Sequence, residues 1–469
     1  MAPKTASTLT GIWTAAAVLV GFVATGSAAS LETGKIPLIS IPDDGTVEVS
    51  AEGFLEERLA LPPDLPEKLS GLEGEDRMRI EHWPVAPGDR RAVTLKRSEV
   101  YGTETRIFEV GDHGIREVPR SPRQHFIGEI DDEPGSGVLV ILDPRGRRVT
   151  GMSVSGGEMF DLEPVPGGLW SEVRVVASEE RSPGRMASWG CGEEELDRPN
   201  RIPDLTRIAA PSSAEKSVGP LEAVLAIDTD TELLSQKFGN NTSAAADYVA
   251  DLIAAMNVMY SRDLDVTLIQ GVTYLRTGSD PYTANSGSNA SPSELYEFGN
   301  YWKSNYGSVQ RALAAMLSGK SPSSNSASGI AWVGGLCSTS YGYSFSKVFK
   351  SNYLSGDAKI VGHEIGHNFG SPHTHCYNPP IDQCYANEGG CYQGATSCPG
   401  GPGTLMSYCH ITGCGSTLDF HPTVVNRIVT YHVNPATGVC IFEANQGGDN
   451  VFQDGFEGGG LGSWSSSSQ

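Results

Sequence analysis

Apolar positions in the second half of the chain follow two spacings, one typical of buried strands and the other of helices. Residues 221–227 are mostly apolar, which indicates a buried strand, and residues 243–262 place apolar side chains at helical spacing in an alanine-rich stretch. The same patterns predict strands at 265–269, 312–316 and 330–333, and helices at 293–304, 356–369 and 422–432. Because strands and helices alternate here, we expect helices packed on a sheet in an α/β or α+β arrangement.

The first third of the chain consists of short strand-like runs separated by proline, glycine and charged clusters. Residues 105–110 and 137–142 are two such runs. A polar stretch with spaced prolines then extends to residue 220, and this is a linker composition. The predicted organisation is a β-rich domain at 30–190, a connecting region at 191–220, a second domain at 221–446 and a Gly- and Ser-rich tail at 447–469.

The N-terminus has the pattern of a secretory signal peptide. Lys4 supplies a positive charge, residues 11–24 are apolar, and Ser27, Ala28 and Ala29 fit a cleavage site. We therefore predict that residues 1–29 are removed and that the protein is secreted. The alternative is an uncleaved anchor. No later segment approaches the ~20 apolar residues of a membrane-spanning helix, so a soluble product is expected.

Charge and cysteine content narrow the classes of function. The net charge of −22 argues against nucleic acid as a partner, and most of the excess precedes residue 216. Cys191 is the only cysteine in the first half. The eight others form an even set that predicts up to four disulfides in an oxidising compartment, with a cysteine-rich zinc cluster as the competing interpretation. These eight are Cys337, Cys376, Cys384, Cys391, Cys398, Cys409, Cys414 and Cys440.

The strongest chemical signal is the run H-E-x-x-H-x-x-G-x-x-H at residues 363–373, which begins in the predicted helix 356–369. His363 and His367 are four residues apart, so both imidazoles lie on one helix face, next to Glu364. Gly370 can adopt the positive φ that ends the helix and turns the chain back, which brings His373 round as a third nitrogen ligand. Three imidazoles with an open fourth position predict a catalytic Zn²⁺ site, in which Glu364 is the general base. The alternative is a solvated helix face.

His375 is a possible rival for the third ligand position, although the spacing from Gly370 favours His373. The residue directly after the third histidine is Thr374. His410 and His421 have no ligand spacing and are interpreted as ordinary surface or core histidines.

With two further segments, the zinc motif resembles the metzincin metallopeptidases, closest to the adamalysin or reprolysin-like branch. The segments are residues 329–337 and residues 404–408, and the resemblance extends over 221–445. It implies a zincin-like catalytic domain with a mixed twisted sheet, an active-site helix and a cysteine-rich lower lobe, preceded by a β-rich pro-domain. It also implies that Met406 forms the Met-turn beneath the zinc ligands.

The same resemblance assigns further residues. Residues 329–337 resemble the edge strand on which a substrate peptide pairs, and we assign Gly334, Gly335 and Leu336 to that strand. Cys337 is implied to pair with Cys440. The other disulfide pairings cannot be read from the sequence.

Two departures from the adamalysin branch affect the expected chemistry. Thr374 stands where that branch usually has Asp, and Met406-Ser407-Tyr408 resembles the Met-x-Tyr of astacins and serralysins. That likeness implies that Tyr408 binds the oxyanion, and the alternative is a packed tyrosine with a bonded hydroxyl.

A Ca²⁺ site is the weakest expectation drawn from the family. Glu222 and Asn445 fall where calcium ligands lie in the branch, but the Asp expected near Val309 is missing.

Cys191 lies between two glycines just before the linker, a position that resembles the cysteine switch of metzincin pro-domains. A thiolate is a strong zinc ligand, and on the fourth coordination site it would displace the catalytic water. On this interpretation residues 30 to about 215 are a propeptide that is removed after secretion. One alternative is that Cys191 is a buried thiol without a role. The other is that Cys191 forms a disulfide with one of the eight other cysteines, so that one of those eight is left without a disulfide partner.

The function predicted from the sequence is a secreted, monomeric zinc endopeptidase that acts on proteins or peptides and is inhibited by its own propeptide. Two other functions remain open. One is a non-catalytic adhesion module on the same fold, and the other is a zinc hydrolase of non-peptide amides. The presence of Glu364 favours an enzyme over the first, and the strand-like segment 329–336 favours a peptide substrate over the second.

Overall fold

A computed structural model describes residues 37–50, 53–74, 76–178, 189–191, 220–287, 289–323 and 326–444. The predicted signal peptide, the tail and most of the predicted linker lie outside these ranges. No helix in the described part of the chain is both long enough and apolar enough to cross a membrane.

The first of two sheets has ten strands in the described residues, in the order β1-β4-β5-β8-β9-β10-β11-β12-β3-β2. Only the pairing of β1 with β4 is parallel. Strand β4 also contacts β10 and β12, so the sheet curls round one apolar cluster, against which helix α1 (Leu65–Ser70) packs. The strands are β1 (Leu38–Ser40), β2 (Thr46–Val49), β3 (Leu55–Ala60), β4 (Arg77–Ala86), β5 (Asp89–Ser98), β8 (Gln124–Ile130), β9 (Glu133–Asp143), β10 (Arg148–Ser155), β11 (Glu158–Pro164) and β12 (Glu172–Ala177).

The second sheet is mixed and follows the order β13-β17-β18-β16-β14-β15-β6-β7, with β19 paired to β14. The central strands are parallel, and β17 runs antiparallel to β18. The predicted strands at 221–227, 265–269, 312–316 and 330–333 all fall in or beside this sheet. Its strands are β6 (Ile107–Gly111), β7 (Gly114–Val118), β13 (Trp189–Cys191), β14 (Leu221–Thr229), β15 (Val266–Arg276), β16 (Leu313–Ser318), β17 (Ala327–Ala331), β18 (Tyr343–Lys347) and β19 (Ile441–Glu443).

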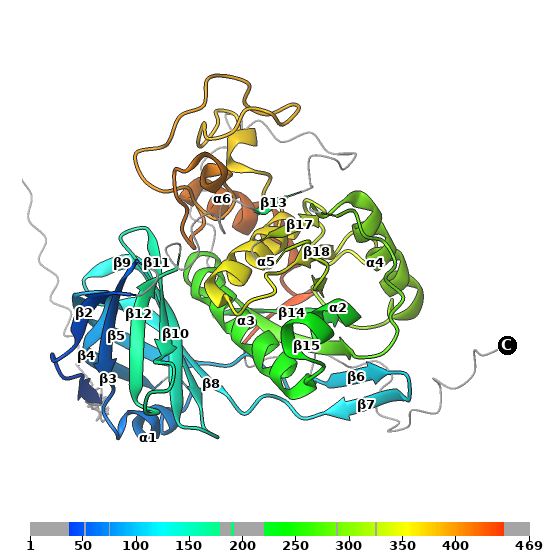
Figure 1. The fold of residues 1–469 in the computed structure, drawn as a ribbon. Helices are drawn as coiled ribbons and strands as arrows, with labels where there is room; N and C mark the ends of the chain where they lie inside the picture. The colour runs from blue at the N-terminus through cyan, green and yellow to red at the C-terminus, as the bar shows by residue number, and fades with distance from the viewer. Residues whose placement is uncertain are drawn as a thin grey trace, which may run out of the picture. The chain divides into compact units, whose positions relative to one another are not determined.

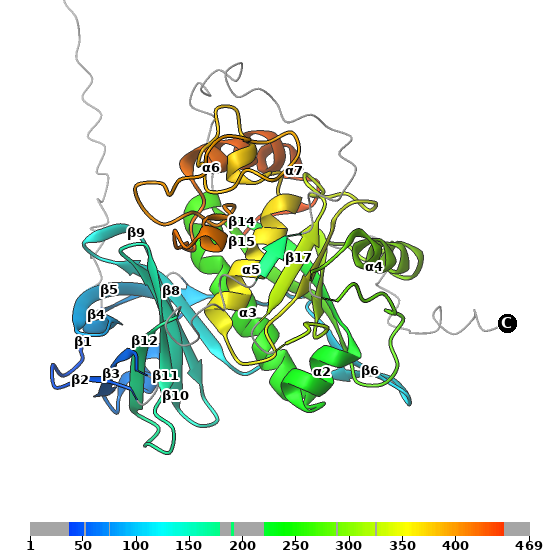
Figure 2. The ribbon, with the colours of Figure 1, turned by 45° about the horizontal axis from the view of Figure 1, so that its top comes forward.

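Helices cover both faces of the second sheet, as Figures 1 and 2 show. Alternate residues of β16 explain this, because Ala314 and Met316 pack with α4 whereas Leu313 and Leu317 pack with α3 and α5. The helices are α2 (Thr231–Phe238), α3 (Thr242–Leu264), α4 (Pro292–Asn305), α5 (Leu354–Asn368), α6 (Pro422–Ile428), a π-helical turn (Val429–Val433) and α7 (Asn434–Ala436). The predicted mixed fold is thus confirmed.

Two segments that precede the predicted second domain join its sheet. The hairpin β6-β7 contains the predicted strand 105–110, yet β6 pairs in parallel with β15 rather than with the first sheet. At the opposite edge, β13 pairs in parallel with β17. Strand periodicity identifies a strand but does not identify its partner, so the sequence could not assign either segment to this sheet.

Four disulfides constrain the second domain, and the described backbone between the zinc motif and α6 has only short 3-10 helices, at Thr374–Cys376 and Cys409–Thr412, as helical elements. The predicted Cys337–Cys440 bond is present and confirms that pairing. The other three bonds link Cys376 to Cys391, Cys384 to Cys409 and Cys398 to Cys414.

Candidate metal centre and active site

Helix α5 carries the first two histidines through the interior of the second domain. Every residue from Ser355 to Asn368 is buried. Its first turn is held by Asp357, whose carboxylate accepts hydrogen bonds from the Lys237 ammonium at 2.8 Å and the Phe349 amide at 2.9 Å. The helix ends at Asn368, and Gly370 has a φ of 101°, as the motif predicted. A rigid, buried helix therefore sets the positions of His363 and His367.

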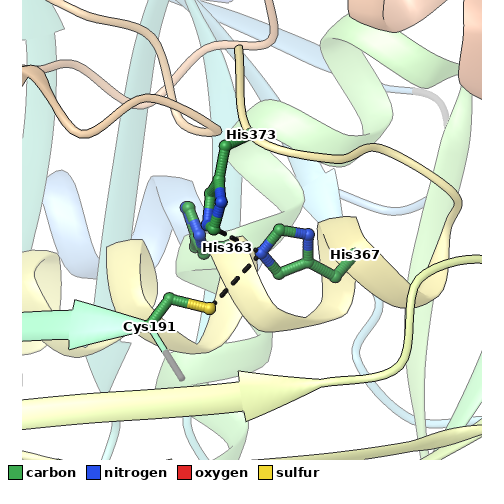
Figure 3. A group of neighbouring side chains, drawn as sticks. All are labelled: Cys191, His363, His367 and His373. Atoms are coloured by element: carbon green, nitrogen blue, oxygen red, sulfur yellow. Dashed lines mark hydrogen bonds between the residues drawn. The ribbon is translucent and has the colours of Figure 1, made fainter. Parts of the chain in front are cut away.

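The structure brings the three predicted histidine ligands together (Figure 3). The Nε2 atoms of His367 and His373 are 3.2 Å apart. Two nitrogen ligands about 2.0 Å from a tetrahedral zinc ion stand about 3.3 Å from each other, so this separation fits a shared ion.

Hydrogen bonds at Nδ1 determine the tautomers of all three rings. His363 Nδ1 lies 2.7 Å from the Leu405 carbonyl oxygen, and His367 Nδ1 lies 2.7 Å from that of Ser371. His373 Nδ1 lies 2.8 Å from Glu388 Oε2. Carbonyl and carboxylate oxygens only accept, so each Nδ1 carries the proton and each Nε2 presents a lone pair.

The electrostatic environment keeps two of these rings neutral. Burial lowers the pKa of His363 and of His367 well below the ordinary histidine value, and the adjacent His373 lowers both further. Neutral imidazole is the form that binds a metal ion. Three buried Nε2 lone pairs directed at one region therefore fit Zn²⁺.

Cys191 is the fourth member of this group. One ligand atom from each of Cys191, His363, His367 and His373 lies within 4.8 Å of the others. The Cys191 Sγ atom is 3.5 Å from His367 Nε2, close to the separation of about 3.6 Å expected for a sulfur and a nitrogen on one tetrahedral zinc. Cys191 is buried and lies outside the four disulfides. Its backbone is held at this place by the pairing of β13 with β17.

Glu364 lies beside the same group. One of its carboxylate oxygens is 3.5 Å from Cys191 Sγ, and the side chain is fully buried. Gly329 of β17 makes room for it, since a Cβ built on Gly329 would stand 2.3 Å from the Glu364 side chain. A glycine at this point of the edge strand is therefore required by the carboxylate behind it.

Gly329→Ala is expected to displace the Glu364 carboxylate and to lower kcat by at least about tenfold, the factor that corresponds to 1.4 kcal/mol in the barrier. The physical reason is the steric overlap, because both groups are buried and neither can move into solvent. Steady-state hydrolysis of a peptide by the activated protein measures the effect. Gly389→Ala is the control, since a Cβ there meets no atom within 4 Å. Unchanged kcat in Gly329→Ala would contradict this account of the strand.

Met406 and Tyr408 both lie next to the histidine-bearing elements. A Cβ on Gly366 of α5 would stand 2.5 Å from Met406 Sδ, so the methionine packs directly against the helix that carries the ligands. The Tyr408 ring centroid is 4.2 Å from that of His373. Its hydroxyl donates a hydrogen bond to the Cys191 carbonyl oxygen at 3.0 Å.

Glu388 is a site residue that the sequence did not identify. It is buried, and its Oε2 atom accepts from His373 Nδ1 at 2.8 Å and lies 2.9 Å from His375 Nε2. Although burial alone would raise the pKa of this carboxyl, His373 and His375 hold it well below its usual range. His375 thus lies behind the third ligand, on the side of Glu388. In the sequence, Glu388 is only an acidic residue in a cysteine-rich segment. No motif spacing links Glu388 to the histidines, so the sequence could not mark it as a site residue.

Glu388→Ala is expected to weaken zinc binding by about 10–100-fold, the usual effect of removing the carboxylate that orients a ligating histidine. Competition against a chelator of known affinity measures this change. Glu297→Ala, on α4 and bonded to Thr283, is the control. An affinity equal to that of the parent protein would exclude an orienting role for Glu388.

The predicted edge strand needs a correction. Strand β17 ends at Ala331, and Gly334, Gly335 and Leu336 lie in turns beyond it. The amides of Gly334 and Leu336 donate to the carbonyls of His367 and Asn368 at 2.8 and 3.0 Å, so this segment is tied to the end of α5. Gly334 has a φ of 73°, which interrupts an extended strand.

The described structure does not test the two residues proposed as calcium ligands. Glu222 is in β14, where its register partner is Phe442 of β19. Asn445 lies outside the described residues.

A model of a known protein family matches part of the chain. Residues 222–418 match the reprolysin model of metallo-peptidase family M12, which confirms the resemblance over these residues. Metalloproteinase-II from Bacteroides fragilis is a similar solved structure, with 14% identity and a TM-score of 0.38 over 66% of this chain and 85% of that chain. A chaperone-substrate complex matches with 12% identity and a TM-score of 0.27 over 46% of this chain and 36% of that chain. No curated protein sequence matches.

Proposed function

We propose that this protein is a secreted zinc-dependent endopeptidase made as an inactive precursor. The match of residues 222–418 to metallo-peptidase family M12 supports this proposal. The observation that carries the proposal is the convergence of three imidazoles, two of them kept neutral by burial, beside a buried carboxylate. His363, His367 and His373 would hold the ion. Bound zinc supplies a Lewis acid that polarises a carbonyl and lowers the pKa of a bound water.

Glu364 is the general base of the proposed reaction. Its carboxylate takes a proton from the attacking water and later delivers that proton to the leaving amine. The neighbouring Gly329 leaves the carboxylate against the edge strand, where a peptide bond could approach. A buried carboxylate next to the histidines, and a strand edge on which an extended chain can pair, fit peptide hydrolysis better than a structural metal site.

Tyr408 is proposed to donate a hydrogen bond to the oxygen of the scissile carbonyl. Its hydroxyl already donates to a peptide carbonyl, that of Cys191, at 3.0 Å. A preorganised donor aimed at a developing oxyanion stabilises the transition state by about 2.7–4 kcal/mol.

The substrate is proposed to be an extended peptide that pairs with the edge of β17. In the structure β13 occupies that edge, with Trp189, Gly190 and Cys191 in register with residues Ala327 to Gly329. A strand of the chain itself therefore stands where a substrate strand would add. This supports latency of the precursor by two means, a thiol beside the zinc ligands and a blocked strand edge.

Addition of a zinc chelator to the activated protein is expected to reduce hydrolysis of a quenched fluorogenic peptide to background. Added Zn²⁺ should restore the activity, because His363 and His367 lie on the buried helix α5 and Glu388 orients His373. The non-chelating isomer of the same chelator is the control, and metal analysis should give one zinc per chain. If metal is bound at this ratio but no peptide or protein substrate is cut, the protein is a non-catalytic binding module on the same fold.

A further inference from the structure

Residues 37–178 are joined to the α/β domain by backbone pairing, by a shared apolar core and by a buried charge cluster. The pairing extends the second sheet at β15. The Gln270 amide donates to the Val100 carbonyl at 2.8 Å, and the Thr273 amide donates to that of Arg106 at 2.9 Å. Without this segment, the long strand β15 would expose its edge donors and acceptors.

The apolar core is continuous across the two parts. Ile127, Leu139 and Met152 of the first sheet belong to the same buried cluster as α3 and β15. The surfaces fit closely, since a Cβ on Gly137 would stand 2.4 Å from Val258 of α3. Every residue of α3 from Ala245 to Tyr260 is buried. A helix at the surface of a free domain normally has a solvated polar face, and α3 has none because β8 and β9 cover it.

Two acidic side chains of α3 face the first domain. Asp247 accepts from Ser121 at 2.6 Å and from Arg145 at 2.5 Å. Asp251 lies 2.9 Å from His125 Nε2 and also binds Arg123. Among the described residues, all hydrogen-bond and ion-pair partners of both carboxylates come from this N-terminal part. The pattern of charges therefore selects one partner surface.

We propose that residues 37–178 remain bound to the α/β domain as a permanent subunit after the connecting chain is cut, which makes the mature enzyme a non-covalent two-chain complex. The inference rests on the proposed zymogen function and revises its expectation that the propeptide leaves. Cutting the chain removes only the tether, and all three kinds of contact persist. Among the described strands, the three-residue strand β13 pairs with β17, and the Tyr408 hydroxyl also holds the Cys191 carbonyl.

A consequence concerns the position of the cut. Cys191 follows the N-terminal domain in the chain, so a cut after it leaves the thiol attached to a domain that stays bound. Such a protein remains latent. A second cut before Trp189 frees the short strand β13, and only then is the edge of β17 exposed.

Engineered sites for a specific protease test this proposal in the full chain. One variant carries a site within 192–219, and a second carries that site and another within 179–188. After digestion, native size-exclusion with light scattering should show both large fragments together in each variant, at a mass close to that of the uncut chain. Peptide hydrolysis should rise at least tenfold only in the doubly cut protein. Separation of the fragments, or full activity after the single cut, overturns the proposal.

Arg123→Glu places a negative charge against Asp247 and Asp251 and should weaken the cut complex by at least about 30-fold. Arg148→Glu, an exposed change of the same charge on β10, should leave it intact. If Arg123→Glu does not fold, Arg123→Ala provides the milder test. If the fragments of each variant that folds stay bound as tightly as those of the parent, the charge cluster does not hold the two domains together. Co-elution without hydrolysis in any variant would refute the proposed function and leave the inference standing. Hydrolysis by a catalytic fragment that has separated from the N-terminal domain would refute the inference and support the proposed function.

Discussion

Glu364→Gln is expected to lower peptide hydrolysis by about 10²–10⁴-fold while one zinc ion stays bound. The amide keeps the size of the carboxylate and leaves the three imidazoles unchanged, but it cannot accept a proton from water. The loss should appear in kcat, because substrate binding depends on the edge of β17 and not on this side chain.

Three measurements separate a catalytic effect from a structural one. Zinc content and thermal stability should match the parent protein, and single-turnover hydrolysis should be slow. Glu232→Gln, at the start of α2, is the control for an amide substitution elsewhere in the domain. A Glu364→Gln protein that loses its metal would point to a ligand or structural role, and one that cleaves at the parent rate would show that another group is the base.

Cys191→Ser is expected to raise the activity of the uncut precursor by at least about tenfold, equivalent to 1.4 kcal/mol. A hydroxyl is a much weaker zinc ligand than a thiolate, so the fourth position becomes available to water. The rise should fall short of full activity because β13 still pairs with β17 and the Tyr408 hydroxyl still bonds to the carbonyl of residue 191.

The measurement is the initial rate of fluorogenic peptide hydrolysis, with gel analysis to show that the chain remains uncut. A thiol-modifying reagent on the parent precursor offers a second route to the same state. If Cys191→Ser stays as inactive as the parent and regains activity only after cleavage, the strand rather than the thiol maintains latency.

The metal ligands could be predicted because their geometry is local. His363 and His367 are one helical turn apart, and a single positive φ at Gly370 returns the chain to His373. Eleven consecutive residues therefore contain nearly all the information for the ligand set. Periodicity likewise identified α3, α5 and the central strands, because burial of one face of a helix or strand leaves a repeat in the sequence.

Contacts between distant segments required the tertiary structure. Glu388 reaches His373 through a segment shaped by disulfides. Cys191 meets His367, which lies 176 residues further along the chain, and β6 pairs with a strand of the other domain. The sequence by itself determined which side chains are chemically able to hold zinc and activate water, since spacing on one helix is enough for that. Only the tertiary structure decided what surrounds them, because a pattern of apolar residues shows that a face is buried but not which surface buries it.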